Sequence, residues 1–272
     1  MKTILDDIVT RKRLEVARAI ESVPVTELEA ALRDAPPTRG FAAALRENPG
    51  ELRTNVIAEI KRKSPSAGLI REDFDPVDIA KRYQDAGAKA ISCLTDGPGF
   101  GGSIEYLEMV RDATSLPVLR KDFIIDPYQI TEARARGADA VLLIAECLDD
   151  DMLRRCRDRA LDLDLSVLIE LHAEENLERL VGTHDFAGEH ELLLGINNRD
   201  LARMKTDLNR TEELLSKPAA RGIDREGVVS ESGIRTPEDL ESLRRAGVRI
   251  VLVGEHLMRQ GDPGAALKKL LS

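Results

Sequence analysis

Residues 135–145 read ARGADAVLLIA, and this short stretch predicts how the chain folds. Gly137 separates a polar, helix-like segment from an apolar run that has no polar alternation. Glycine adopts the left-handed conformation that ends a helix at little cost. Runs rich in Val, Ile and Leu are typical of strands buried on both faces of a parallel sheet. The stretch therefore predicts a helix, a tight turn and a buried parallel strand in direct succession.

The same succession recurs along the chain. In DAGAKAI and RAGVRIV, Gly87 and Gly247 stand at the same place as Gly137 in ARGADAV. The distances between these glycines are multiples of about 25 to 27 residues, which is the length of one strand–helix unit. Eight apolar runs of this kind are present, at residues 55–60, 89–94, 117–123, 138–145, 166–171, 191–196, 227–232 and 248–254. Eight units predict an α/β fold, the closed (β/α)8 or TIM barrel, whose usual size is about 250 residues. An open doubly wound sheet is the alternative, but no glycine-rich dinucleotide-binding pattern follows the first run.

The starts of three helices have a capping side chain followed by proline at the first helical position: Asp75-Pro76, Asp126-Pro127 and Thr236-Pro237. Three residues after each cap stand Asp78, Gln129 and Asp239, at or near the spacing of a capping box.

Residues 1–47 precede the first strand and predict an N-terminal helical extension. Apolar residues at helical spacing indicate a first helix. A second helix is expected to start at Thr26, with Glu29 completing a capping box, and to stop at Pro36-Pro37. We expect this extension to pack on the barrel within a single domain of residues 1–272.

The composition excludes several classes of function. Asp and Glu number 49 against 40 Lys and Arg, so the formal net charge is −9, and neither nucleic acid nor an anionic membrane is an expected partner. No stretch approaches the roughly 20 apolar residues that cross a bilayer. The three cysteines (Cys93, Cys147 and Cys156) are too few and odd in number for a disulfide framework and suit the cytoplasm. The histidines lack metal-ligand spacing, so surface or structural roles and no metal are expected for His172, His184, His190 and His256.

Charged side chains stand where several apolar runs end, which is where the active site of a barrel lies. Glu59, Lys121 and Glu170 interrupt or follow runs that should line the barrel, and a buried charge is costly unless it is paired. One charge at a strand end is typical of a solvated loop, but three strands bringing Glu, Lys and Glu to one mouth predict an acid–base site. Further polar residues at these ends are Lys61, Ser64, Asn197, Arg199, Glu231 and Ser232.

The last two strands are followed by the loops that bind phosphate in this fold. Gly233 and Gly254 leave backbone amides open to an anion, and a short helix starting near Glu255 would add its N-terminal dipole. The alternative is that both glycines serve only the turns. The Glu255 carboxylate must point away from a phosphate, so only its amide could help.

These segments also resemble a known family. IAEIKRKSPS (57–66), LRKDFIID (119–126), VLIEL (167–171), LGINNRDL (194–201), VSESGI (229–234) and LVGEHLM (252–258) follow, in order, the signature segments of the indole-3-glycerol phosphate synthase family. The resemblance implies a carbon–carbon carboxy-lyase of tryptophan biosynthesis. Its substrate would be 1-(2-carboxyphenylamino)-1-deoxyribulose 5-phosphate, and no metal or organic cofactor would take part. Association with other enzymes of that pathway is left open.

The resemblance also implies roles for single residues. Lys121 would be the general acid of ring closure, and Glu170 would assist proton transfer in the dehydration. Glu59 would orient this pair, and Lys61 would hold the substrate near its carboxylate and help in the proton transfers. A lysine near other cations has its pKa lowered toward neutrality, which we expect for Lys121. Substrate binding would fall to Asn197, Arg199, Glu231 and Ser232, and phosphate binding to Gly233 and Gly254.

Three other functions fit the same barrel. A Schiff-base lyase or aldolase would use Lys61 or Lys121 as a covalent nucleophile. A phosphoribosylanthranilate isomerase would rearrange a sugar without loss of CO₂. A catalytically silent barrel would bind a phosphorylated metabolite or a protein, and it would have no need of Lys121 or Glu170.

Overall fold

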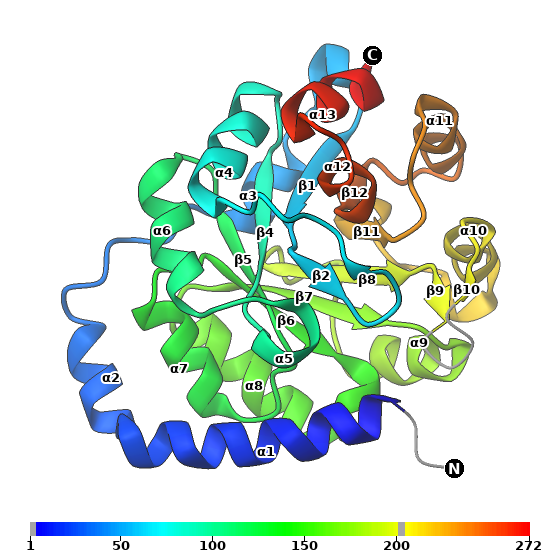
Figure 1. The fold of residues 1–272 in the computed structure, drawn as a ribbon. Coiled ribbons are helices and arrows are strands. Elements are labelled where there is room, and N and C mark those ends of the chain that lie inside the picture. Colours follow the sequence, from blue (N-terminus) through cyan, green and yellow to red (C-terminus); the bar gives the residue numbers. More distant parts are fainter. Residues whose placement is uncertain (1–3, 201–204) are drawn as a thin grey trace.

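A closed parallel barrel forms the centre of the computed structural model, which describes residues 4–200 and 205–272 (Figure 1). Within these residues its eight strands are β1 (Asn55–Ile60), β4 (Ala90–Leu94), β5 (Val118–Lys121), β6 (Ala140–Ile144), β7 (Ser166–Leu171), β8 (Leu192–Asn197), β11 (Val228–Glu231) and β12 (Ile250–Val253). Strand β1 pairs in parallel with both β4 and β12, so the sheet has no edge. The predicted barrel is confirmed, and the open sheet is excluded. Residues 1–3 of the predicted extension, and Leu201 at the end of LGINNRDL, lie outside the described residues.

Helices surround the barrel, and most follow a strand. The outer helices are α4 (Pro76–Asp85), α6 (Glu105–Ala113), α7 (Pro127–Ala135), α8 (Asp150–Asp162), α9 (Glu174–Val181), α10 (Asn209–Ser216), α11 (Pro237–Arg245) and α13 (Pro263–Leu271). Asp75, Asp126 and Thr236 cap α4, α7 and α11 as predicted. Thr236 forms a full capping box with Asp239. No helix in the described part of the chain has the length and apolar character needed to cross a membrane.

Short elements occupy the loops. Two hairpins, β2 (Lys63–Ser64) with β3 (Gly68–Leu69) and β9 (Arg199–Asp200) with β10 (Lys205–Thr206), follow β1 and β8. The remaining short helices are α5 (Gly97–Phe100), α12 (Glu255–Met258), η1 (Gly50–Leu52), η2 (Ala145–Cys147), η3 (Pro218–Ala220) and η4 (Arg225–Gly227).

The short helix α3 (Phe41–Arg46) closes the amino-terminal end of the barrel. Phe41 and Leu45 are buried against side chains that fill the barrel interior, such as Leu119. The amide of Ala42 donates to the Ser166 hydroxyl at the start of β7. Since this end is filled, a substrate must enter at the carboxyl ends of the strands, where active sites of this fold lie.

Two further helices make up the rest of the extension: α1 (Ile4–Ser22) and α2 (Val25–Ala31). Val16 of α1 and Leu28 of α2 pack with Tyr128 of α7. The predicted start at Thr26 is wrong. Pro24 is the N-cap residue of α2, no side chain caps the helix, and it ends at Ala31, before Pro36. Proline fixes φ and so starts the helix earlier than the capping pattern indicated. That the chain is one domain stays a prediction.

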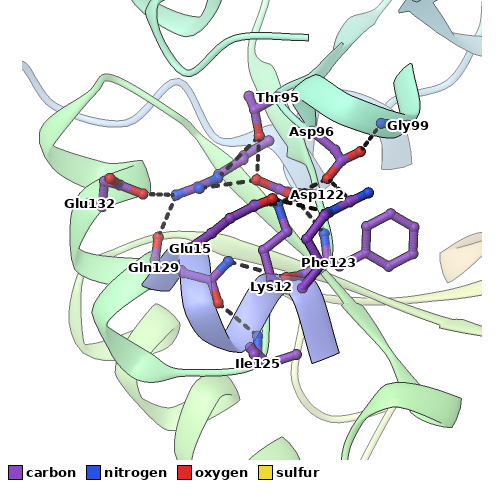
Figure 2. A network of polar contacts seen from close by, with 12 residues as sticks. Lys12, Glu15, Thr95, Asp96, Gly99, Asp122, Phe123, Ile125, Gln129 and Glu132 are labelled. Carbon is purple, nitrogen blue, oxygen red and sulfur yellow. Dashed lines mark hydrogen bonds and ion pairs between the residues drawn. The ribbon is translucent and has the colours of Figure 1, made fainter. Parts of the chain in front are cut away.

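One lysine of α1 reaches into a cluster of carboxylates beside the barrel (Figure 2). The Nζ of Lys12, a buried residue, lies 2.9 Å from Asp122 Oδ1, 3.0 Å from Asp96 Oδ1 and 2.8 Å from Glu15 Oε2. Burial by itself lowers the pKa of Lys12, but the carboxylates outweigh burial and raise it. Burial likewise raises the pKa of Asp122, but Arg120 and Lys12 outweigh it, and the pKa is lowered. Lys12 and Asp122 are therefore both ionised, and the cluster joins α1 to the ends of β4 and β5.

We predict that Lys12→Met destabilises the fold. Removing one member of a buried ionic cluster leaves the others uncompensated, which costs about 3–5 kcal/mol. Urea unfolding of the variant should show a loss of this size. Arg13→Met, on the exposed side of the same helix, is the control and should change the free energy of unfolding by less than about 0.5 kcal/mol. Equal losses in the two variants would contradict the structural role of Lys12.

Candidate active site

A cavity of about 350 Å³ opens at the carboxyl ends of the barrel strands. All but one of the predicted site residues line it: Glu59, Lys61, Lys121, Glu170, Asn197, Arg199, Glu231, Ser232, Gly233, Gly254 and Glu255. The exception is Ser64. It is buried in the β2–β3 hairpin, where its hydroxyl accepts a hydrogen bond of 3.1 Å from the amide of Ala67. A substrate contact of Ser64 stays a prediction.

The ammonium of Lys121 lies between two glutamates. Its Nζ is 2.7 Å from Glu170 Oε2 and 3.4 Å from Glu231 Oε2. Burial alone lowers the pKa of Lys121, but Glu170, Glu231 and Glu59 together outweigh burial and raise it. The expectation that neighbouring cations lower this pKa is therefore wrong. Carboxylates, rather than Lys61 or Arg199, are the nearest charges, and opposite charges favour the ionised form.

The two glutamates differ in charge because their environments differ. Burial raises the pKa of Glu170, but Lys121 and His172 outweigh it and lower the pKa to about 2. Asn197 Nδ2 also donates to Glu170 Oε1 at 3.1 Å. For Glu231, burial and the charge of Glu170 raise the pKa well above its ordinary value. The site therefore places an ammonium between two carboxyl groups whose pKa values are shifted in opposite directions.

A second ion pair stands next to this group. Lys61 donates to the carboxylate of Glu59, and both side chains are nearly buried. Gly254 packs against this carboxylate so closely that a methyl group there would lie 2.8 Å from Glu59 Cδ. The absence of a side chain at position 254 is therefore needed to hold the Glu59–Lys61 pair, apart from any role in binding phosphate.

The rim of the cavity is basic. Arg199 donates to Ser66 Oγ at 2.8 Å and to Glu255 Oε2 at 3.2 Å. Arg259 holds the other oxygen of Glu255 at 3.0 Å. Burial raises the pKa of Glu255, but the two arginines outweigh it and lower the pKa. The Glu255 side chain thus forms ion pairs with two arginines that would otherwise attract an anion.

Sequence reasoning missed several residues of the site. The rings of Phe100 and Phe123 stand 6.1 Å apart at the wall of the cavity and provide an apolar, aromatic surface. His172 was expected to be structural or on the surface, yet its Nε2 is 3.2 Å from Glu170 Oε1. Residues two apart on a strand share one face, so the spacing of Glu170 and His172 was a usable signal. No cluster of metal-ligating side chains was found in the described parts of the chain.

Comparison with known proteins decides the family. The profile of indole-3-glycerol phosphate synthase matches residues 5–270. The chain belongs to the indole-3-glycerol phosphate synthase family. It is 50% identical to the indole-3-glycerol phosphate synthase of Rhodopirellula baltica, over 99% of each chain. It is 46% identical to that of Verminephrobacter eiseniae, over the full length of both.

Solved structures support the fold. A 3-hexulose-6-phosphate synthase from Salmonella typhimurium matches with a TM-score of 0.59 at 14% identity, covering 80% of this chain and 96% of that one. A protein from Aquifex aeolicus matches with a TM-score of 0.61 at 13% identity, covering 86% and 98%. At these identities the likeness shows the barrel alone.

We predict that Gly254→Ala destabilises the protein, because the added methyl group must displace the Glu59 carboxylate from Lys61. Overpacking of this kind costs about 1–3 kcal/mol, measurable by urea unfolding. Gly261→Ala is the control, since nothing lies within 4 Å of a methyl group there. A Gly254→Ala variant as stable as the control would show that the Glu59 side chain can move aside without loss of stability.

Proposed function

We propose that the protein converts 1-(2-carboxyphenylamino)-1-deoxyribulose 5-phosphate to indole-3-glycerol phosphate. The aromatic carbon that bears the carboxylate bonds to the ribulose carbonyl carbon, and the carbonyl oxygen takes up a proton. CO₂ then leaves that ring carbon. Finally the new hydroxyl leaves as water, and the neighbouring carbon loses a proton. The observation that carries the proposal is the Lys121 ammonium held between Glu170 and Glu231 in a cavity of a chain from this family.

Lys121 is the proton donor in ring closure. Its raised pKa keeps it as an ammonium near neutral pH, which is the form that a general acid needs. The same state speaks against a Schiff-base lyase, because a covalent nucleophile must be a neutral amine.

Glu170 serves the dehydration. Its lowered pKa makes it a carboxylate, the form that accepts a proton from carbon. Glu59 orients the reacting groups through its pair with Lys61, and Lys61 faces the substrate carboxylate and aids the proton transfers. Glu231, whose pKa is raised, contacts the sugar hydroxyls as a neutral acid that both donates and accepts hydrogen bonds.

The remaining residues hold the substrate. Asn197 and Arg199 position hydroxyl and carboxylate groups, and Ser232 contacts the sugar chain. Ser64, in the hairpin after β1, also contacts the substrate. The backbone amides at Gly233, Gly254 and Glu255 receive the phosphate. The aromatic wall of Phe100 and Phe123 suits the carboxyphenyl ring.

The proposed reaction uses no metal or organic cofactor, since each step is a proton transfer or a bond cleavage that side chains can assist. The cysteines Cys93, Cys147 and Cys156 are free thiols. Free thiols suit a reducing compartment, so we place the reaction in the cytoplasm.

Fluorescence of the indole product tests the activity, and Lys121→Met tests the role of Lys121. Methionine keeps the apolar stem and removes the proton donor, so kcat should fall about 10²–10⁴-fold while substrate still binds. Lys81→Met, on the exposed surface of α4, is the control and should keep full activity. Borohydride added with substrate should leave the mass of the protein unchanged. A covalent adduct on Lys121 would establish a Schiff-base mechanism instead, and near-normal turnover of Lys121→Met would refute the role.

Inorganic phosphate should compete with substrate, and Gly233→Ala should raise KM. Gly233 has φ +89°, and an added methyl group would lie 2.7 Å from Thr206 Cγ2, so the loop and its amides must move. Phosphate is held throughout the reaction, so its loss raises KM, roughly tenfold or more, with little change in kcat. Gly222→Ala carries similar backbone strain outside the cavity, at φ +101°, and should leave KM unchanged. A normal KM in Gly233→Ala would argue against this phosphate site.

A further inference from the structure

The ring of His172 lies between two carboxylates at the carboxyl end of β7. Its Nδ1 is 3.1 Å from Glu146 Oε2, and its Nε2 is 3.2 Å from Glu170 Oε1. The side chain is only 8% exposed. Nε2 is buried and makes no aligned hydrogen bond, so Glu170 is the acceptor nearest to it.

Glu146, in η2 after β6, fixes the orientation of this ring. One of its oxygens accepts hydrogen bonds of 2.8 Å from the His172 amide and from Asn176 Nδ2. The other oxygen faces Nδ1. A carboxylate facing Nδ1 requires a proton there, as in carboxylate–histidine pairs in general. A neutral ring would then turn a lone pair on Nε2 toward Glu170, whereas an imidazolium turns an N–H toward it.

The other charged groups around His172 do not reverse this preference. Burial lowers the pKa of His172, and Lys121 of β5 lowers it further, but Glu146 and Glu170 outweigh both and raise it. Arg210 of α10 donates to the His172 carbonyl rather than to the ring. Asn176 of α9 is neutral. Carboxylates at both ring nitrogens thus favour the imidazolium form, which is a second cation against Glu170 beside Lys121.

We propose that His172, oriented by Glu146, is a positioning residue that keeps Glu170 ionised and in place when Lys121 turns to the substrate. This inference rests on the proposed function, in which Lys121 gives its proton to the carbonyl oxygen. At that moment Glu170 loses the charge of its nearest cation. The imidazolium is then the cation that remains against Oε1, so Glu170 stays a carboxylate for the dehydration.

Two substitutions of His172 separate its two contacts. The amide nitrogen of Asn is as many bonds from Cα as Nδ1 is, and that of Gln is as many as Nε2 is. His172→Asn thus keeps a donor toward Glu146 and loses the donor toward Glu170, whereas His172→Gln keeps a donor toward Glu170. We expect His172→Asn to lower kcat about tenfold or more, the effect of losing one close ion-pair contact to Glu170, with KM within about twofold. His172→Gln should recover only part of this loss, because its amide donates to Glu170 but carries no charge, and His190→Asn, at an exposed site, should keep full activity.

Titration of the His172 ring by NMR gives a readout that does not depend on activity. The midpoint should lie above the ordinary value of 6.5 in the wild-type protein and fall in Glu146→Gln. If the wild-type protein forms no indole product, the proposed function is refuted, and the titration still tests the contact between His172 and Glu146. An active wild-type protein with a normal kcat in His172→Asn would overturn the positioning role alone. Equal losses of kcat in His172→Asn and His172→Gln, or a midpoint unmoved in Glu146→Gln, would also overturn it.

Discussion

The site depends on the burial of one ammonium group, that of Lys121. An ammonium removed from water requires carboxylates close by, and the structure supplies them from two other strands, with Glu170 on β7 and Glu231 on β11. Two carboxylates around one ammonium cannot both remain ionised without repulsion, and their pKa values are shifted in opposite directions. Lys121 lowers the pKa of both glutamates, and the difference comes from His172 and Asn197 beside Glu170 and from burial and the charge of Glu170 at Glu231.

The same strand end carries a second buried ionic group. Successive residues of a strand point to opposite faces, so Lys121 enters the cavity while Asp122 turns outward to Lys12 of α1. Asp122 also accepts from Arg120 and from Thr95. These contacts fix the backbone on either side of Lys121, and they connect the N-terminal helix to the ends of β4 and β5. A loss of Lys12 is therefore a loss of support for β5 as well as of stability.

Local pattern predicted the elements and the strand ends, because both depend on residues that are neighbours in sequence. The eight apolar runs correspond to the eight barrel strands, and Glu59, Lys121 and Glu170 converge as expected. The direction of the Lys121 pKa shift was not predictable in this way. It depends on which charges lie nearest in space, and Glu170 and Glu231 lie 49 and 110 positions away along the chain. Part of the surroundings of His172 and Lys12 was missed for the same reason, since Glu146 comes from η2 and the partners Asp96 and Asp122 come from the ends of β4 and β5. The start of α2 was misplaced because two start signals, Pro24 and Thr26, competed within three residues.

The charge distribution also explains how an acidic protein can hold an anionic substrate. Four glutamates, Glu59, Glu170, Glu231 and Glu255, line the cavity, and a substrate with a phosphate and a carboxylate should be repelled by them. Three of them face a cation at close range: Lys61, Lys121 and the arginine pair Arg199 and Arg259. The fourth, Glu231, avoids the repulsion by taking up a proton, which its burial favours. The incoming anions therefore meet cations that are already paired with carboxylates. At the fourth position they meet Glu231, whose raised pKa favours its neutral form.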